Sequence, residues 1–310
     1  KNMKVLLANP RGFCAGVDRA IEIVERALKL HGRPIYVRHE VVHNKFVVNK
    51  LKNKGAIFVE DIEDIPENGV IIFSAHGVSQ NVRNKANEIT QTIYDATCPL
   101  VTKVHKEVVK NQKQNQTVIL IGHQGHPEVE GTLGQSKEGK KIHLVETADD
   151  IQGLDFNGKD SLSYTTQTTL SLDDTKIIAN ALKNRFPDIA SPKKDDICYA
   201  TQNRQDAVKR LMQTSDMLIV LGSKNSSNSN RLKEIALNMK KPSYLVDSAD
   251  EINPKWFSGV STVGVTAGAS APELLVQEVV EWLISFGCDE VTEVKGAKES
   301  TKFPVPKSLR

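Results

Sequence analysis

Three cysteines of this sequence stand where a thiol could act as a ligand or a nucleophile. Cys14 follows a Gly-Phe turn in "ANPRGFCAGVDRA" and precedes a helical pattern, and Cys98 precedes Pro99, a residue that suits the first turn of a helix. Cys198, in "DDICYATQNRQDAV", stands at the end of an expected strand shortly before another helix. The unpaired N–H groups and the positive dipole end of a helix N-terminus lower a thiol pKa and favour the thiolate. Each of these cysteines, taken alone, could be a buried and unreactive thiol. All three stand just before a helix, however, and this shared position favours a functional role.

No CxxC pair is present, so the sequence does not predict a zinc finger, a ferredoxin-type cluster motif or a thioredoxin motif. Three isolated thiolates suit either zinc with an open coordination position or a cubane iron–sulfur cluster in which one iron has no protein ligand. Cys288, in "FGCDE" near the end of the last helical pattern, lacks the turn context and is predicted to be structural.

Polar side chains that bind oxyanions or move protons follow the ends of several apolar runs. In open parallel sheets, ligands bind at the carboxyl ends of the strands. Singly, each of these residues has an ordinary structural explanation, such as a hydrogen-bonded histidine or a serine that caps a helix. Their convergence with three candidate thiolates favours a binding site. The residues are His43, His76, His123, His126, Glu128, Thr165 to Thr169, Ser226, Ser227, Asn228 and Ser270.

The ligand expected from these side chains is a small anionic group. Neither a Walker lysine pattern nor a GxGxxG motif is present, which argues against a nucleotide. Hydroxyl, amide and imidazole groups at helix N-termini form a cradle for phosphate oxygens. Glu128 is the one carboxylate set among these motifs, in "HPE", and could deliver protons inside a closed site.

Composition excludes several classes of protein. The 310 residues carry 41 basic and 38 acidic side chains, a net charge of +3, which is too balanced for nonspecific nucleic-acid binding or a polybasic membrane anchor. No apolar run is long enough for a transmembrane helix, and "KNMKVLLANP" predicts a short strand rather than a signal peptide. Widely spaced cysteines indicate a reducing compartment. We therefore expect the bacterial cytoplasm, or a plastid-type organelle if a targeting extension was removed.

The elements that must position these residues alternate between short apolar runs and amphipathic stretches, which predicts an α/β fold with mostly parallel sheets. Strands are expected at 4–9, 34–39, 70–75, 117–122, 162–166, 217–222, 243–247 and 261–267, and helices at 15–30, 45–54, 99–114, 172–185, 204–214, 230–240 and 272–286.

The cysteines recur at intervals of roughly ninety residues, which suggests three α/β units of similar size, each contributing one cysteine to a shared centre. The expected domains are residues 1–98, 99–197 and 198–288, followed by a polar, basic C-terminal tail at 289–310 that is packed on the surface or partly mobile.

Nine sequence blocks together resemble one protein family. In order they are "NPRGFCAGVDRA", "RHEVVHN", "FSAHGVS", "DATCPLVTKVH", "GHPEVEGT", "TQTTLS", "DDICYATQNRQ", "GSKNSSNSNRL" and "GVTAGASAPE". They look like the signature blocks of the 4-hydroxy-3-methylbut-2-enyl diphosphate reductases, the IspH (LytB) family. The likeness runs from about residue 4 to residue 286. Gln124 stands where many relatives have a small residue, which affects no proposed ligand.

The resemblance implies more than the residues alone indicate. It implies a trefoil-like, pseudo-threefold arrangement of three α/β domains around a central 4Fe-4S cluster with three cysteine ligands and one open iron site. It also implies reductive dehydroxylation of 4-hydroxy-3-methylbut-2-enyl diphosphate to isopentenyl and dimethylallyl diphosphates, the last step of the methylerythritol phosphate route to isoprenoids. An external one-electron donor such as reduced ferredoxin or flavodoxin is the expected partner, and neither nucleic acid nor a membrane is expected.

The resemblance also implies a role for each site residue. The implied cluster ligands are Cys14, Cys98 and Cys198, and the implied catalytic residues are Glu128 and Thr168. The implied diphosphate ligands are His43, His76, His126, Ser226, Ser227, Asn228 and Ser270.

Two other functions remain open from the residues themselves. One is another three-cysteine iron–sulfur enzyme, a dehydratase or a quinolinate-synthase-like enzyme, which would need no external electrons. The other is a zinc-stabilised binding module without catalysis.

Overall fold

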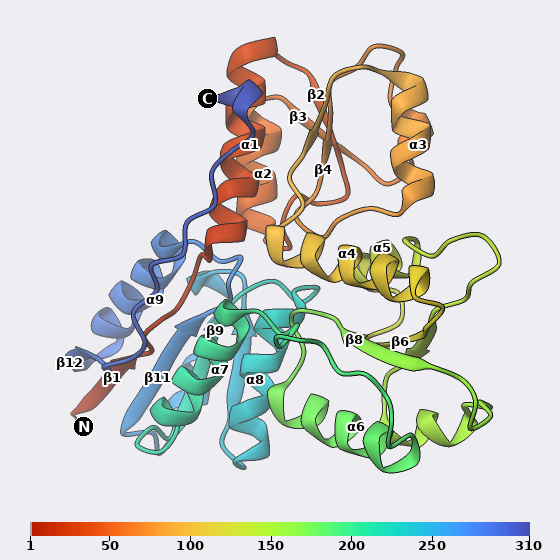
Figure 1. Cartoon of the computed structure of the whole chain (residues 1–310). Helices are drawn as coiled ribbons and strands as arrows, with labels where there is room; N and C mark the ends of the chain where they lie inside the picture. Colours follow the sequence, from red (N-terminus) through yellow and green to blue (C-terminus); the bar gives the residue numbers. More distant parts are fainter. Residues whose placement is uncertain (1) are drawn as a thin grey trace. The chain divides into compact units, whose positions relative to one another are not determined.

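The computed structural model describes residues 2–310. Its described residues form an α/β chain with three parallel sheets, which confirms the predicted fold class (Figure 1). By its internal contacts the chain divides into two compact units. Unit 1 comprises residues 1–18, 42–51 and 199–302, and unit 2 comprises residues 19–41, 52–198 and 303–310.

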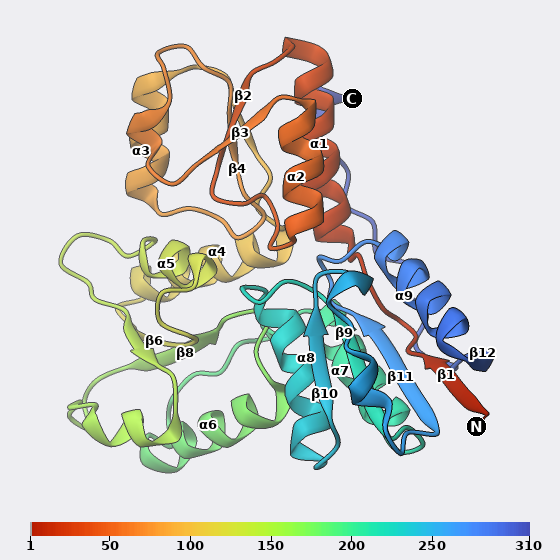
Figure 2. The same ribbon diagram turned by 180° about the vertical axis from the view of Figure 1, so that it is seen from behind.

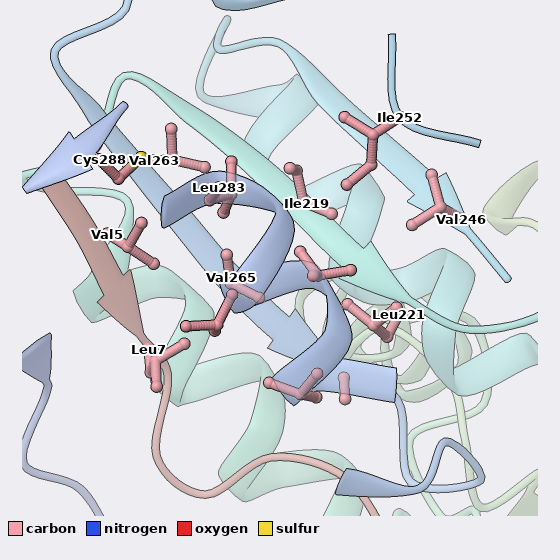
Figure 3. Close-up of a cluster of buried hydrophobic side chains, with 14 of the residues drawn as sticks. Val5, Leu7, Ile219, Leu221, Val246, Ile252, Val263, Val265, Leu283 and Cys288 are labelled. Carbon is pink, nitrogen blue, oxygen red and sulfur yellow. The ribbon is translucent and has the colours of Figure 1, made fainter. Parts of the chain in front are cut away.

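The sheet of unit 1 has the strand order β10-β9-β11-β1-β12, and every pairing in it is parallel. Side chains of β9 alternate between two cores: Ile219 and Leu221 pack with helix α9, while Leu218 and Val220 pack with α7 and α8. Both faces are therefore covered, as an all-parallel sheet requires, and Figure 3 shows the core on the α9 face. The strands are β1 (Met3–Leu7), β9 (Met217–Leu221), β10 (Ser243–Val246), β11 (Thr262–Ala267) and β12 (Cys288–Glu293), and the helices are α7 (Tyr199–Leu211), α8 (Ser227–Asn238) and α9 (Glu273–Phe286).

Unit 2 contains the other two sheets, with the orders β3-β2-β4-β5 and β7-β6-β8. Helix α3 packs on one face of the first sheet. In the second sheet, Val118 and Leu120 pack toward α4 and α5, while Ile119 and Ile121 pack toward α6. The first sheet has the strands β2 (Ile35–Arg38), β3 (Ala56–Val59), β4 (Ile71–Phe73) and β5 (Ile93–Asp95), and the second has β6 (Thr117–Ile121), β7 (His143–Val145) and β8 (Leu162–Thr166). The helices are α3 (Gln80–Ile89), α4 (Pro99–Lys113), α5 (Pro127–Leu133) and α6 (Leu172–Arg185), while α1 (Ala15–His31) and α2 (Lys45–Lys54) each have residues in both units.

All the expected strands and helices are present, with ends shifted by a few residues; α7 begins at Tyr199 rather than at 204. The structure adds the helices α3 and α5 and the strands β3, β5, β7 and β12. The short strands β5 and β7 have three residues each, too few for a clear alternation of apolar and polar side chains.

The chain ends differ from a simple sequential division into domains. Strand β1 pairs with β11 and β12, so the first strand of the sequence completes the sheet of its last third. The expected tail at 289–310 begins inside β12, and Val305 and Leu309 are buried. The boundaries at 98, 197 and 288 remain a prediction, but no sequential boundary can describe a sheet that takes strands from both ends of the chain.

Candidate active site

Each of the three predicted cysteine ligands directly precedes a helix. Cys14, Cys98 and Cys198 are followed by the first residues of α1, α4 and α7, and Cys98 is the N-cap of α4 with Pro99 in the first turn. Among the described residues none of the four cysteines forms a disulfide bond. Cys288 is instead the buried first residue of β12, and burial raises the pKa of its thiol to about 11.

The Cys14 turn is set by backbone hydrogen bonds to the end of β11 and the loop after it. Gly12 has a φ of +72°, a left-handed conformation that favours glycine, and its N–H donates to the carbonyl of Ala267 over 3.0 Å. The Cys14 N–H donates to the carbonyl of Ala269 over 3.2 Å. Burial raises the pKa of the Cys14 thiol, while hydrogen bonds from the N–H groups of the following helical turn oppose that rise.

A buried arginine that no sequence motif marked as functional also holds this turn. Arg204 is fully buried, and its guanidinium donates to the carbonyl oxygens of Gly12 (2.9 Å), Phe13 (3.2 Å) and Ala200 (3.1 Å). Its remaining donors meet both carboxylate oxygens of Glu299, at 3.0 and 3.1 Å. All five N–H groups of the guanidinium therefore donate to acceptors within the protein. These bonds fix the guanidinium in one orientation and with it the backbone of the Cys14 turn.

The predicted oxyanion ligands of unit 1 lie on loops and at the start of helix α8, and hydrogen bonds connect these segments. The Ser270 hydroxyl donates to the His43 carbonyl over 3.0 Å, and the Asn228 side-chain oxygen accepts from the N–H of Ala269 over 2.8 Å. Ala269 is the residue that also accepts from Cys14, so these side chains and the Cys14 turn share one loop. Ser226 is the N-cap of α8, with its hydroxyl accepting from the N–H of Ser229, and Ser227 is the first residue of that helix.

In unit 2, two predicted histidines lie together. The rings of His76 and His126 have centroids 5.8 Å apart in an edge-to-face arrangement. The residue before His76, Ala75, accepts a hydrogen bond from the Cys98 N–H over 3.0 Å. His126 caps α5, where its Nδ1 accepts from the N–H of Glu128 over 3.1 Å. His123, also noted in the sequence, lies 4.0 Å from the exposed Glu146 carboxylate.

Glu128 and Thr168 form a closed pair in unit 2. Glu128 is only 3% exposed, and its two carboxylate oxygens accept from the backbone N–H of Thr168 (2.7 Å) and from the Thr168 hydroxyl (2.9 Å). The Thr168 carbonyl in turn accepts from the Cys198 N–H over 3.0 Å. Burial raises the pKa of Glu128 to about 7; the two hydrogen bonds from Thr168 limit the rise, and the Asp196 carboxylate adds to it.

Asp196 is a second buried carboxyl close to this pair. Its side chain accepts from the N–H of Thr166 over 3.0 Å and lies 3.2 Å from the Lys103 ammonium. Burial raises its pKa to about 6, while these two partners oppose the shift.

The backbone N–H of each cysteine therefore donates to a loop that carries a predicted site residue. Cys14 bonds to the loop of the diphosphate ligand Ser270, Cys98 to that of the diphosphate ligand His76, and Cys198 to that of the catalytic residue Thr168. Cys14 belongs to unit 1, and Cys98 and Cys198 belong to unit 2. In residues 2–310 no three His, Cys, Asp or Glu side chains form a group that could hold a metal ion as they stand. No helix of these residues is both long enough and apolar enough to cross a bilayer.

Comparison with known proteins identifies the family. The family model described as "LytB protein" matches residues 5–284. The chain belongs to the LytB family. A curated relative from Ruthia magnifica subsp. Calyptogena magnifica, named 4-hydroxy-3-methylbut-2-enyl diphosphate reductase, is 69% identical over 308 residues, which cover 99% of this chain and 100% of the relative.

Solved structures agree with the family. The E-1-hydroxy-2-methyl-but-2-enyl-4-diphosphate reductase from Plasmodium falciparum matches with a TM-score of 0.96 and 41% identity, covering 100% of this LytB-family chain and 97% of the solved one. A second solved structure, described as (E)-4-hydroxy-3-methyl-but-2-enyl diphosphate reductase, the terminal enzyme of the non-mevalonate pathway, matches with a TM-score of 0.65 and 32% identity over 91% of this chain. The resemblance stated from nine short blocks is confirmed over the full length.

Proposed function

We propose that this LytB-family chain reduces 4-hydroxy-3-methylbut-2-enyl diphosphate to isopentenyl and dimethylallyl diphosphates, the last step of the non-mevalonate route. The full-length match to relatives that carry the reductase name supports this function. It also argues against a dehydratase, a quinolinate-synthase-like enzyme and a zinc-stabilised binding module, because those would be expected to match other families. The single structural observation that carries the proposal is the buried Glu128–Thr168 pair beside the Cys198 loop.

The proposed cofactor is a 4Fe-4S cluster held by Cys14, Cys98 and Cys198. Thiolate sulfur is the usual protein ligand of such clusters, and three cysteines at helix starts, outside any disulfide, fit that donor set. Burial raises the pKa of the free Cys14 thiol, against the lowering that its place at a helix start predicts, and the helix N–H groups beside it oppose that rise only in part. A bound metal ion deprotonates a coordinating thiol, so the cluster itself would favour the thiolate that a ligand requires. When bound, the cluster supplies one-electron chemistry and an open iron that acts as a Lewis acid toward the substrate hydroxyl.

The proposed diphosphate ligands are neutral or weakly basic groups at strand ends. Unit 1 provides Ser226, Ser227, Asn228 and Ser270 together with His43, and unit 2 provides His76 and His126. The hydroxyl and amide hydrogens of these groups donate to phosphate oxygens, and the N-terminus of α8 adds its helix dipole.

Glu128 is proposed to deliver the proton that lets the hydroxyl leave as water. A carboxyl with a pKa of about 7 holds a proton at neutral pH and can also release it, which is what a general acid needs. The Thr168 hydroxyl donates to one carboxylate oxygen and so orients the group that carries the proton.

The test replaces Glu128 by Gln, which keeps size and hydrogen-bonding reach but has no acidic proton. We expect the variant to keep its iron and to turn over about 10²–10⁴-fold more slowly in an anaerobic assay, the usual cost of losing a general acid. Glu130→Gln is the control, since Glu130 is an exposed acid of the same helix α5. Near-normal turnover of the Glu128→Gln protein with full iron content would contradict the proton-donor role.

The cluster ligands have a separate test. Serine in place of Cys14, Cys98 or Cys198 is expected to remove most iron and sulfide from protein purified anaerobically. Cys288→Ser is the matched control and should keep both, because Cys288 lies in the core of the unit 1 sheet. Equal iron loss from the Cys288 variant would show that the ligand assignment is wrong.

An external one-electron donor, such as reduced ferredoxin or flavodoxin, is proposed to supply the electrons, and the expected location is the cytoplasm. Turnover that depends on an added reductant separates a reductase from a lyase.

A further inference from the structure

Helix α4 carries a row of lysines that the proposed chemistry does not use. Lys103, Lys106, Lys110 and Lys113 are spaced by three, four and three residues, which places them along one side of the helix. Lys103 pairs with Asp196 at 3.2 Å. Within the described part of the chain, no carboxylate pairs with Lys106, Lys110 or Lys113, and all three are exposed. Figure 1 shows α4 in unit 2.

Two cavities adjoin this row, with volumes of about 490 and 480 Å³. The first lies between α3 and α4, where Arg83 and Lys110 line it, and the second includes Arg19 and Lys103. Figure 2 shows α3 and α4 from behind. The two cavities share four lining residues and therefore form one continuous depression, which we call the α4 groove. The shared residues are Asp95, Thr97, Thr102 and Lys106.

The α4 groove has a strong excess of positive charge. Asp95 is the one carboxylate that lines it among residues 2–310, and Asp95 is already paired with Arg83 at 2.7 Å. The ammonium groups of Lys106, Lys110 and Lys113 therefore have no neutralising partner in the groove. A surface of one sign in a depression attracts a partner of the opposite sign and accelerates its association.

One end of the groove lies at the start of α4. Thr97 and Pro99 line the second cavity, and Cys98 stands between them in the chain. Cys98 is a proposed cluster ligand. A redox partner seated in the groove would therefore approach the cluster from the side of Cys98.

We propose that the α4 groove is the docking surface for an acidic one-electron carrier protein, an inference that rests on the proposed reductase function. Two successive docking events deliver two electrons, and each oxidises one carrier by one electron. The C–O bond of the substrate breaks, one proton leaves with the hydroxyl as water, and the two electrons with a second proton form the new C–H bond.

A nucleic acid is a less suitable partner. No phenylalanine, tyrosine or tryptophan lines either cavity in residues 2–310, so the groove offers no platform on which bases could stack. The whole chain has a net charge of only +3.

The test compares two electron sources in the holoenzyme. The triple variant Lys106→Gln, Lys110→Gln, Lys113→Gln is assayed anaerobically with a reduced acidic flavodoxin and, separately, with reduced methyl viologen, a small cation that needs no docking surface. We expect the KM for flavodoxin to rise at least about tenfold and to lose most of its salt dependence. Turnover with methyl viologen and iron content should stay unchanged.

The matched control changes the same charge elsewhere in unit 2: Lys159→Gln, Lys176→Gln, Lys183→Gln, all exposed and away from α4. An equal rise of the flavodoxin KM in this control, or an unchanged KM in the α4 variant, would overturn the docking assignment. The docking assignment would also be overturned if the wild-type protein retained RNA, the α4 variant did not, and the two proteins had the same KM for flavodoxin. Absence of turnover with methyl viologen in the wild-type protein would instead refute the reductase function, and the docking proposal with it. Single substitutions of the same lysines serve if the triple variant does not fold.

Discussion

Arg204 in unit 1 and Glu128 in unit 2 are both buried ionisable side chains, but their surroundings differ. Arg204 has five hydrogen bonds, two of them to the opposite charge of Glu299. Glu128 receives two hydrogen bonds, both from the uncharged Thr168, and no cation hydrogen-bonds to its carboxylate in residues 2–310. A buried charge is costly unless it is paired and hydrogen-bonded.

The difference separates a structural role from a chemical one. Because every N–H group of Arg204 has an acceptor, its guanidinium keeps one orientation and holds the Cys14 turn in place. Partial compensation leaves the ionised form of Glu128 disfavoured, so its pKa rises to about 7 and its proton is exchangeable near neutral pH. Chemistry at a buried carboxyl requires that the protein leave the charge incompletely satisfied.

The largest loss in the free energy of unfolding is expected from Arg204→Met, which removes the fully hydrogen-bonded guanidinium. This variant leaves the turn carbonyls without their donor and leaves the Glu299 carboxylate with only the Asn203 amide, which donates over 3.0 Å. Removing one partner of a buried ion pair costs about 3–5 kcal/mol. Anaerobic chemical denaturation should show this loss in the free energy of unfolding, accompanied by a lower iron content.

Two further variants control that measurement. Arg204→Met combined with Glu299→Gln should recover part of the loss, because no buried charge is then unpaired. Arg33→Met, at an exposed arginine, should change the free energy of unfolding by about 0.5 kcal/mol or less. An Arg204→Met protein as stable as the wild type would remove the distinction between the two charges.

The next largest effect is expected in the pH dependence of stability, through the variant Glu128→Gln. A rise of the pKa from 4.5 to about 7 means that folding favours the protonated acid. Glu128 alone then lowers the free energy of unfolding of the wild-type protein by about 3 kcal/mol as the pH rises through this range, at about 1.4 kcal/mol per pH unit. Glu128→Gln has no such loss, so its advantage over the wild type should be near zero below pH 4.5 and about 3 kcal/mol above pH 7.

Denaturation midpoints measured from pH 4 to pH 8 check this difference, and Glu130→Gln should follow the wild-type curve. A Glu128→Gln protein that is less stable than the wild type at pH 8 would mean that the carboxylate is compensated after all.

The smallest effect tests whether uncharged groups also hold the Cys14 turn. The Tyr199 hydroxyl accepts from the N–H of Ala15, the residue after Cys14, over 3.1 Å. Tyr199→Phe leaves that N–H without its partner and should cost about 1 kcal/mol. Tyr36→Phe is the control, since no hydrogen bond of the Tyr36 hydroxyl occurs among the described residues. If Tyr199→Phe lost as much free energy of unfolding as Arg204→Met, the tyrosine hydroxyl would support the turn as strongly as the Arg204 guanidinium does.

Features that depend on neighbours along the chain could be predicted from the amino-acid sequence. Apolar runs of four to six residues and helical periodicity specified most strands and helices, and proline after cysteine marked the start of α4. The polar blocks that follow apolar strands also marked Glu128 and the residues Thr165 to Thr169, whereas the role of Thr168 within its block came from the family resemblance. The seven-residue helix α5 escaped detection because it has under two turns and contains Gly131.

Contacts between residues far apart in the sequence became visible in the folded chain alone. Strand β1 pairs with β11 and β12, more than 250 residues away, and Glu299 meets Arg204 across 95 residues. Glu299 stands in a polar C-terminal segment whose composition predicts an exposed or mobile chain, yet its carboxylate neutralises a buried arginine. Local propensity carries no information on which segment supplies the opposite charge. That choice follows from burial, because an arginine removed from water must take whatever carboxylate and carbonyl oxygens the folded chain brings to it.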